Sequence, residues 1–215
     1  MTSALVSGLP PAQRLALAYC PARARPATLA LLALDDRLAS ILRAQREPIA
    51  SQMRLAWWRD VLARPQPEWP LGEPLLEALR SWHDASALGP LVDGWEALLS
   101  DHLAPPVITE FIAGRAQAFV ALARELGVAQ ADSAEPAART WALADLAAHV
   151  SNADERAQVI DFGRSFPPPT RLEAPLRPLA VLAKLGSISL AHGGAPLLGG
   201  PRSLFAALRT GITGR

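Results

Sequence analysis

Residues 53–62 have the sequence MRLAWWRDVL and place two tryptophans, two arginines and a carboxylate within three helical turns. On a helix that advances about 100° per residue, the hydrophobic side chains fill one broad arc, and Arg54 lies in the middle of it. A buried charge without a partner destabilises a protein by several kcal/mol, so we expect a carboxylate, a carbonyl or an anionic ligand to face Arg54. Asp35 is the first partner that we expect in this role.

The composition of the chain predicts an all-α protein with a single domain. The chain has 215 residues, of which 50% are hydrophobic, and this is enough for one substantial core, so residues 1–215 are expected to form one helical domain. Only 6% of the residues are aromatic, and much of the hydrophobic content is alanine and leucine, which favour helix over strand. The formal net charge of +1 predicts no strong attraction to nucleic acid.

The sequence predicts a cytoplasmic protein without a transmembrane segment. Cys20 is the single cysteine, which excludes an intramolecular disulfide and a cysteine-built metal site and agrees with a reducing compartment. No uninterrupted hydrophobic run approaches the roughly 18 residues of a spanning helix, and the N-terminal residues lack the pattern of a signal peptide. Hydrophobic surface on a helical protein can also dock onto lipid, so the sequence is compatible with peripheral membrane contact.

Hydrophobic periodicity and the positions of prolines predict a series of helices. The clearest pattern begins at Pro105, repeats at spacings of three and four residues, and stops at Gly127. No alternation of period two is long enough to predict a strand. The expected helices cover residues 11–19, 27–43, 48–64, 73–83, 90–103, 105–126, 136–150, 152–162, 180–190 and 203–208.

Asp35 and Asp36 are the first candidates for metal chemistry, because paired carboxylates on a helix can hold magnesium against a diphosphate. Such a site needs a third acid one or two turns further on, where this chain has Ala39 and Arg43. An exposed face or an ion pair is therefore the favoured interpretation. The four histidines lack the spacing of a helical metal pair, and no cysteine, serine or glycine-rich segment stands in a catalytic or nucleotide-binding context. We predict no catalytic residue and no bound metal.

Arg115 lies within the hydrophobic stripe of residues 105–126, in the same unexpected kind of position as the arginine of the first stretch. The preceding Gly114 would let another helix approach closely. Because buried charges are normally paired, one interpretation of Arg115 is an ion pair with an acid such as Asp35 or Asp145.

A second interpretation is a cavity between helices that binds an anion through Arg54 and Arg115. Trp57 and Trp58 would then form a hydrophobic wall of that cavity. Core packing, with the indole N–H bonded to a partner, is the favoured interpretation of both tryptophans. The two interpretations stay open at the level of the sequence.

Several segments of the chain resemble the squalene/phytoene synthase family, in particular its divergent bacterial members and a related mitochondrial complex I assembly factor. The most specific are LDDRL at residues 34–38, Glu-Pro at residues 47–48 and RLAWWRD at residues 54–60. The segment WALADL at residues 141–146 is similar to the second conserved helix of the family, and residues 176–215 are similar to the C-terminal segments of the divergent members.

The resemblance implies an all-helical isoprenoid-synthase fold with a central cavity, here in a shortened form. Catalytic relatives join two prenyl diphosphates head to head, using magnesium bound by two aspartate-rich motifs. By comparison with the family, the acid positions of the first motif fall on Ala39, Ser40 and Arg43, and those of the second fall on His149 and Ala153. Without these carboxylates, magnesium has no cage and a leaving diphosphate has no electrophilic clamp.

The favoured prediction is a non-catalytic protein of this family that binds a protein partner or an isoprenoid-like ligand, without a cofactor. An alternative is an active prenyltransferase of isoprenoid biosynthesis that binds magnesium through Asp35, Asp36 and Asp145. This alternative predicts that the three carboxylates converge on one cavity and are free to bind a metal. A third prediction, an assembly factor for a respiratory complex, rests on the resemblance alone.

Overall fold

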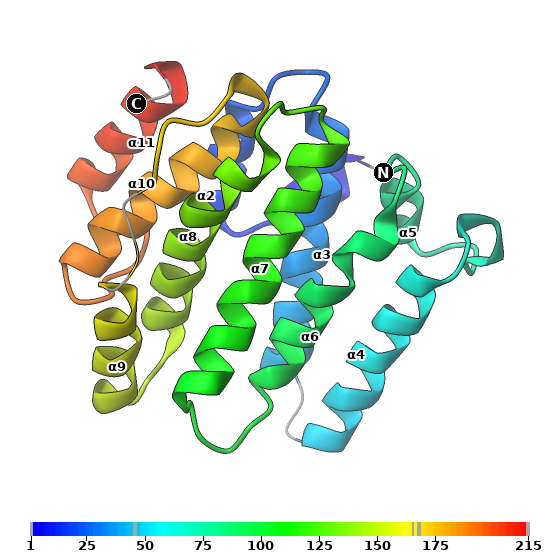
Figure 1. Ribbon diagram of the computed structural model, residues 1–215, viewed down its shortest axis with the longest axis horizontal. Coiled ribbons are helices and arrows are strands. Elements are labelled where there is room, and N and C mark those ends of the chain that lie inside the picture. The colour runs from blue at the N-terminus through cyan, green and yellow to red at the C-terminus, as the bar shows by residue number, and fades with distance from the viewer. Residues whose placement is uncertain (1, 45–46, 165, 167–168, 214–215) are drawn as a thin grey trace.

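The protein folds into an all-helical bundle (Figure 1). The computed structural model describes residues 2–44, 47–164, 166 and 169–213. Helices make up 75% of the structure, and the described residues contain no strand. The prediction of an all-α fold is therefore confirmed.

The described part of the chain contains eleven α-helices and four short 3-10 helices. The α-helices are α1 (Thr2–Gly8), α2 (Pro11–Ala18), α3 (Arg25–Ala44), α4 (Pro48–Ala63), α5 (Pro74–Leu79), α6 (Gly89–Ala97), α7 (Pro105–Glu125), α8 (Ala134–His149), α9 (Ala153–Gly163), α10 (Arg177–Ala191) and α11 (Pro201–Thr213). The 3-10 helices are η1 (Gln66–Glu68), η2 (Ala85–Leu88), η3 (Ala131–Ser133) and η4 (Ala174–Leu176).

Local sequence signals explain where several helices begin. Proline occupies the first turn of α2, α4, α7 and α10, where a backbone N–H would have no partner inside the helix. The side chain of Asn152 caps α9, because its Oδ1 accepts from the N–H groups of Asp154 and Glu155 at 2.8 and 3.2 Å. Helix α1 is not among the predicted helices, since its seven residues are too few to show a periodic pattern.

Helix α7 is central to the bundle and packs between α6 and α8 (Figure 1). On the α8 side, α10 packs against α8 and also contacts α11 and α2. On the other side, α3 contacts α7 and α4 packs against α6 and α3. Helices α4 and α11 consequently lie at opposite ends of the arrangement.

The backbones of α6 and α7 come close together at two glycines. A Cβ atom added to Gly114 would lie 2.2 Å from the carbonyl oxygen of Pro90 and 3.2 Å from the Cα atom of Gly94. Only hydrogen fits at this crossing, which confirms the close approach predicted for Gly114.

Helix α7 is also the one helix of the described residues that is long and apolar enough to cross a membrane by length and composition. In this structure it is a core helix, because 67% of its most hydrophobic window is buried inside the protein.

Candidate functional site

The side chain of Arg115 lies in the core and binds two carboxylates. Its Nε and Nη2 donate to Oδ1 and Oδ2 of Asp35 at 2.9 and 2.8 Å, and its Nη1 donates to Oδ2 of Asp145 at 2.7 Å. These residues come from α7, α3 and α8, and the Arg115 side chain is only 2% exposed. Asp35, Arg115 and Asp145 form the Arg115 cluster, and the prediction that Arg115 is paired with these acids is confirmed.

Three aromatic rings enclose the guanidinium of Arg115. Its Cζ atom lies 4.9 Å from the ring centroids of Trp95 and Phe111 and 4.4 Å from that of Trp141. The indole Nε1 of Trp95 also donates to Oδ1 of Asp35 at 2.9 Å. Cation–π contacts that are shielded from water stabilise by about 2 kcal/mol or more, so the rings help to offset the loss of hydration of the guanidinium.

Burial and the contact of one guanidinium with two carboxylates shift the pKa values of Asp35 and Arg115. Burial raises the pKa of Asp35 above its ordinary value, and the attraction of Arg115 opposes this shift without cancelling it. Burial acts to lower the pKa of Arg115, but the carboxylates of Asp35 and Asp145 outweigh it and hold that pKa above its ordinary value. Arg115 therefore stays charged, and burial favours the protonated form of Asp35.

A cavity of about 160 Å³ lies beside the cluster, and Asp35, Asp36 and Asp145 all line it. Each of these acids already binds a guanidinium, because Asp36 accepts from Nη2 of Arg43 at 3.0 Å, the kind of ion pair expected for it. Pockets for drug-sized ligands begin at roughly 300 Å³, so this cavity is small. Within the described residues, no group of three or more His, Cys, Asp or Glu side chains is placed to hold a metal.

The prediction for Arg54 is wrong. Its side chain is exposed, and within the described part of the chain it makes no ion pair or hydrogen bond, while Asp35 binds Arg115 instead. The physical reason is the position of α4 at the edge of the bundle. Only one side of this helix is covered, and it buries Leu55 and Trp58 there, so the broad hydrophobic arc of the sequence is only partly inside.

Arg54, Trp57 and Trp58 do lie together, in a surface groove between α3 and α4. The groove has a volume of about 470 Å³ and is also lined by Ile41 and Arg37. The two indole rings make an edge-to-face contact, with centroids 5.0 Å apart and an angle of 84° between the rings. Core packing describes the buried Trp58, whereas Trp57 faces solvent and forms part of the groove.

The outer face of α4 carries a stripe of large hydrophobic side chains. Ile49, Met53 and Trp57 follow one another at intervals of four residues and are 73, 70 and 42% exposed. Arg54 lies beside this stripe, which we name the α4 stripe. The spacing of four residues is visible in the sequence, but it predicts a buried face equally well, and this is why the exposed stripe is not found without the structure.

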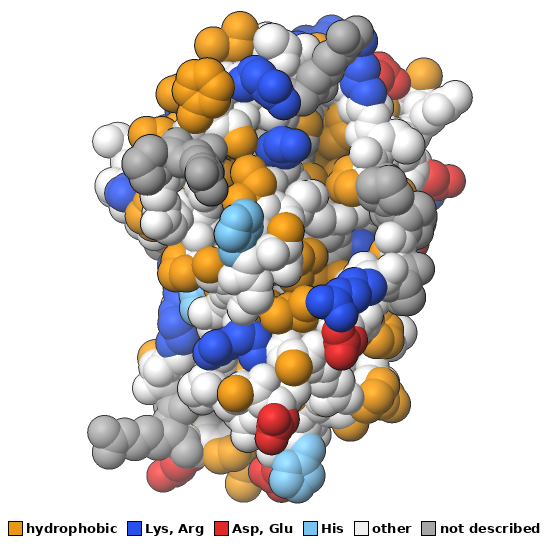
Figure 2. Space-filling model, turned by 90° about the vertical axis from the view of Figure 1, so that its left-hand side faces the viewer, with side chains coloured by type: hydrophobic (Ala, Val, Ile, Leu, Met, Phe, Trp, Pro, Cys, Tyr) orange, Lys and Arg blue, Asp and Glu red, His pale blue; other side chains and the backbone are white. Residues whose placement is uncertain are grey.

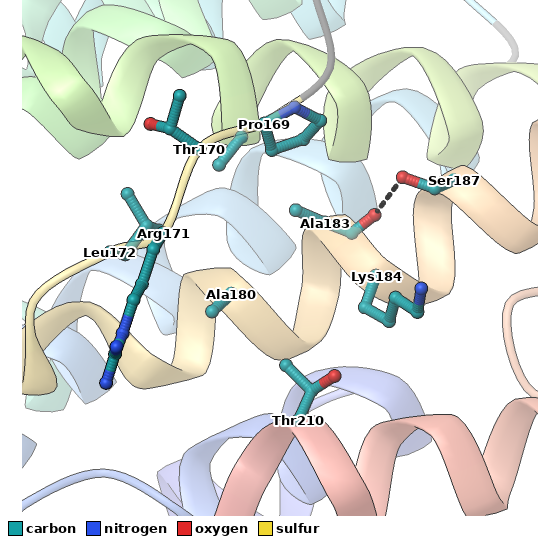
Figure 3. A pocket seen from close by; sticks show the side chains of 10 residues that line it. Pro169, Thr170, Arg171, Leu172, Ala180, Ala183, Lys184, Ser187 and Thr210 are labelled. Atoms are coloured by element: carbon teal, nitrogen blue, oxygen red, sulfur yellow. Dashed lines mark hydrogen bonds between the residues drawn. The ribbon is translucent and has the colours of Figure 1, made fainter. Parts of the chain in front are cut away.

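A further cavity, of about 330 Å³, lies between residues 169–172 and helices α8, α10 and α11 (Figure 3). Arg171 and Lys184 are the charged side chains of its lining, and Ser187 donates to the carbonyl of Ala183 at 2.9 Å. The charged ends of Arg171 and Lys184 point in different directions in Figure 3. These two cations therefore do not converge on a single anion.

The sequence did not indicate the three aromatic residues around Arg115, which are Trp95, Phe111 and Trp141. Phe111 precedes Arg115 by four residues and so shares its helical face, which is a signal that the sequence contains. The placement of Trp95 and Trp141 depends on how α6 and α8 pack against α7, which no local pattern determines.

Comparison with known proteins gives no match to this chain among family models, curated proteins or solved structures.

Proposed function

We propose that this chain is a non-catalytic helical protein of the squalene/phytoene synthase type and that it binds a protein partner through α4. The relation to that family is supported by the segments at residues 34–38, 47–48 and 54–60 together with the all-helical architecture. The observation that carries the proposal is the α4 stripe, in which Ile49, Met53 and Trp57 face solvent.

The contacts of the acidic residues support a role without catalysis. A prenyltransferase that used Asp35, Asp36 and Asp145 would need carboxylates that are free to bind magnesium. In this chain Arg115 holds two of these acids and Arg43 holds the third. Releasing Asp35 or Asp145 to a metal would leave a buried guanidinium short of its partners, which is strongly unfavourable.

The chemistry of the α4 stripe favours an amphipathic helix with acidic residues as the partner. Hydrophobic residues at intervals of four, next to a groove between two helices, suit a helix that is laid against them. Tryptophan and arginine contribute strongly to protein interfaces, and Trp57 and Arg54 are both accessible here. Because Arg54 makes no ion pair within the described residues, a carboxylate of the partner can bind it.

Site-specific photocrosslinking in cells tests this proposal. A crosslinking amino acid at Ile49 or Met53 should give one adduct of reproducible mass, and mass spectrometry should place the adduct on an acidic amphipathic helix of another protein. The matched control is Leu71, which is 87% exposed and lies outside the stripe. Trp57→Ala and Arg54→Glu should abolish the adduct. No adduct, an adduct from Leu71 as well, or an adduct unchanged by these substitutions contradicts the proposal.

An isoprenoid-like ligand is the second candidate, and the groove between α3 and α4 favours it. The volume of about 470 Å³ is within the range of ligand pockets. Trp57 and Trp58 offer an aromatic wall and Arg54 offers a cation, whereas Arg37 is already paired with Glu73 of the same groove. Titration with farnesyl diphosphate, followed by tryptophan fluorescence, tests this candidate. Saturable quenching that is lost in Arg54→Ala supports it, and quenching that is equal in both proteins contradicts it.

An activity assay separates both candidates from a prenyltransferase. Farnesyl or geranylgeranyl diphosphate with magnesium should give no condensation product with the purified protein. Turnover that disappears in Asp35→Asn would overturn the non-catalytic proposal. The role of an assembly factor for a respiratory complex is one form of partner binding, and it is supported by the family resemblance alone.

A further inference from the structure

Helix α11 packs against the protein with its small residues and turns its large hydrophobic residues outward. Its inward face consists of Ser203, Ala207, Thr210 and Gly211, which are all buried. The outward face is hydrophobic. It consists of Leu204, Phe205, Leu208 and Ile212, which are 47, 71, 39 and 70% exposed. We name these four residues the α11 face.

Two contacts fix this orientation of α11. Gly211 lies against the ring of Tyr19, so closely that an added Cβ atom would be 2.5 Å from three carbons of the ring. Nη1 of Arg177, on α10, donates to the carbonyl oxygen of Ile212 at 3.2 Å. Rolling α11 inward to bury Phe205 would place a large side chain where only glycine fits. The outward position of the α11 face therefore follows from the packing of the helix.

Charge is distributed unevenly along the sequence, and α11 belongs to a C-terminal segment with an excess of basic residues. Residues 174–215 contain five Lys or Arg residues and no Asp or Glu, whereas residues 1–173 contain 16 basic and 20 acidic residues. Arg209 is exposed at the edge of the α11 face, and Arg177 binds the end of the helix. Figure 2 shows this side of the molecule, where hydrophobic and basic side chains are interspersed in the upper part.

We propose that the protein docks onto an anionic lipid bilayer through the α11 face. A helix that lies in a membrane interface needs an exposed hydrophobic face with basic residues beside it, and the α11 face has Arg209 at its edge and Arg177 of α10 at its end. Each basic residue near an anionic leaflet adds a favourable electrostatic contribution that salt weakens. The excess of positive charge in residues 174–215 complements such a leaflet, and it is the reason for choosing a bilayer over an uncharged partner.

Vesicle flotation with the full chain tests this proposal. The protein should float with vesicles that contain phosphatidylglycerol and should bind them at least about tenfold more weakly when phosphatidylcholine replaces that lipid. Raising the salt from about 0.1 to 0.5 M should release the protein. Phe205→Ser/Ile212→Ser should reduce binding to the anionic vesicles at least about tenfold, because two exposed hydrophobic side chains are removed. Leu71→Ser, at another exposed leucine, should bind as the wild type does.

Circular dichroism should show equal helix content in all the variants, because the substituted residues are exposed. The proposal is overturned if the wild type does not bind anionic vesicles at low salt, or if Phe205→Ser/Ile212→Ser binds them equally well. It is also overturned if sedimentation equilibrium shows that the wild type is a dimer and this variant a monomer, since a second copy then covers the α11 face. Failure of the α4 proposal leaves this result unaffected, because no residue of α4 takes part.

Discussion

The guanidinium of Arg115 links α3, α7 and α8 through the carboxylates of Asp35 and Asp145. A buried ion pair adds little net stability compared with well-packed hydrophobic residues, because the charges lose their hydration. Removal of one partner is strongly destabilising, since the remaining partner then stays buried without a counter-charge. The cluster therefore specifies how the three helices meet more than it adds to the free energy of unfolding.

We predict that Arg115→Met lowers the free energy of unfolding by about 3–5 kcal/mol, because the buried carboxylate of Asp35 and the partly buried carboxylate of Asp145 lose their guanidinium. Urea denaturation measures this loss. The control is Arg124→Met, which removes an exposed ion pair with Asp132 from the same helix and should change stability by less than about 1 kcal/mol. Arg115→Met/Asp35→Leu should recover part of the loss. Equal effects of the two single substitutions would contradict the buried cluster.

Asp35 should give the protein a characteristic dependence of stability on pH. Its pKa is raised in the folded state by burial, so between the unfolded-state value of about 3.9 and the folded-state value the folded protein binds more protons. The contribution of Asp35 to stability is therefore complete at low pH and is lost as the pH rises through the folded-state pKa. Asparagine at this position does not titrate.

We therefore predict that the stability difference between wild type and Asp35→Asn shrinks as the pH is raised from about 4 to 7. Urea denaturation of both proteins across this range provides the measurement. Asp161→Asn, at an exposed position paired with Arg164, is the control for the loss of one charge. A difference that is constant, or that grows with pH, would show that burial does not raise the pKa of Asp35.

The crossing of helices α6 and α7 depends on Gly114. Alanine at this position would place its Cβ atom 2.2 Å from the backbone oxygen of Pro90, so the two helices would have to separate. We predict that Gly114→Ala lowers the melting temperature and the free energy of unfolding, the latter by about 1–3 kcal/mol. The control is Gly8→Ala in α1, where an added Cβ atom meets no atom within 4 Å and the variant should be neutral or slightly stabilising. Similar losses for both variants would contradict the close crossing.

The sequence predicts the existence of most helices well, because prolines and periodic hydrophobic residues mark them. Helix α7 is expected over residues 105–126 and is found over Pro105–Glu125. The orientation of a helix at the edge of the bundle is much harder to predict. Helix α4 has hydrophobic residues on two sides, so periodicity alone cannot tell which side the neighbouring helices cover. The same ambiguity affects α11, whose hydrophobic face points outward.

The candidate site was predictable where a charge stood inside a long hydrophobic stripe. Arg115 is such a case, because burial leaves few outcomes other than pairing with Asp35 and Asp145. Arg54 also stands within a hydrophobic pattern of the sequence, but no neighbouring helix covers its side of α4, and its side chain is exposed. The difference arises from tertiary position, which a local pattern does not contain.

Helices α4 and α11, which carry the α4 stripe and the α11 face, lie at opposite ends of the bundle (Figure 1). Helices α7, α8 and α10 pack in sequence between them. A protein that contacts lipid through α11 would therefore present α4 away from the bilayer. This arrangement allows a partner and a membrane to be bound at the same time.

We predict that the two surfaces act independently, because substitutions at distant sites without shared contacts have additive effects. Met53→Glu should abolish photocrosslinking from Ile49 and leave flotation with anionic vesicles unchanged. Phe205→Ser/Ile212→Ser should reduce flotation and leave the crosslink from Ile49 unchanged in vesicle-free extract. The protein with all three substitutions should lose both activities and keep the helix content of the wild type. A lower crosslink yield from Ile49 for Phe205→Ser/Ile212→Ser in vesicle-free extract would contradict this independence. Membrane docking cannot contribute in that extract, so such a result would mean that one partner covers both surfaces or that the two surfaces are coupled.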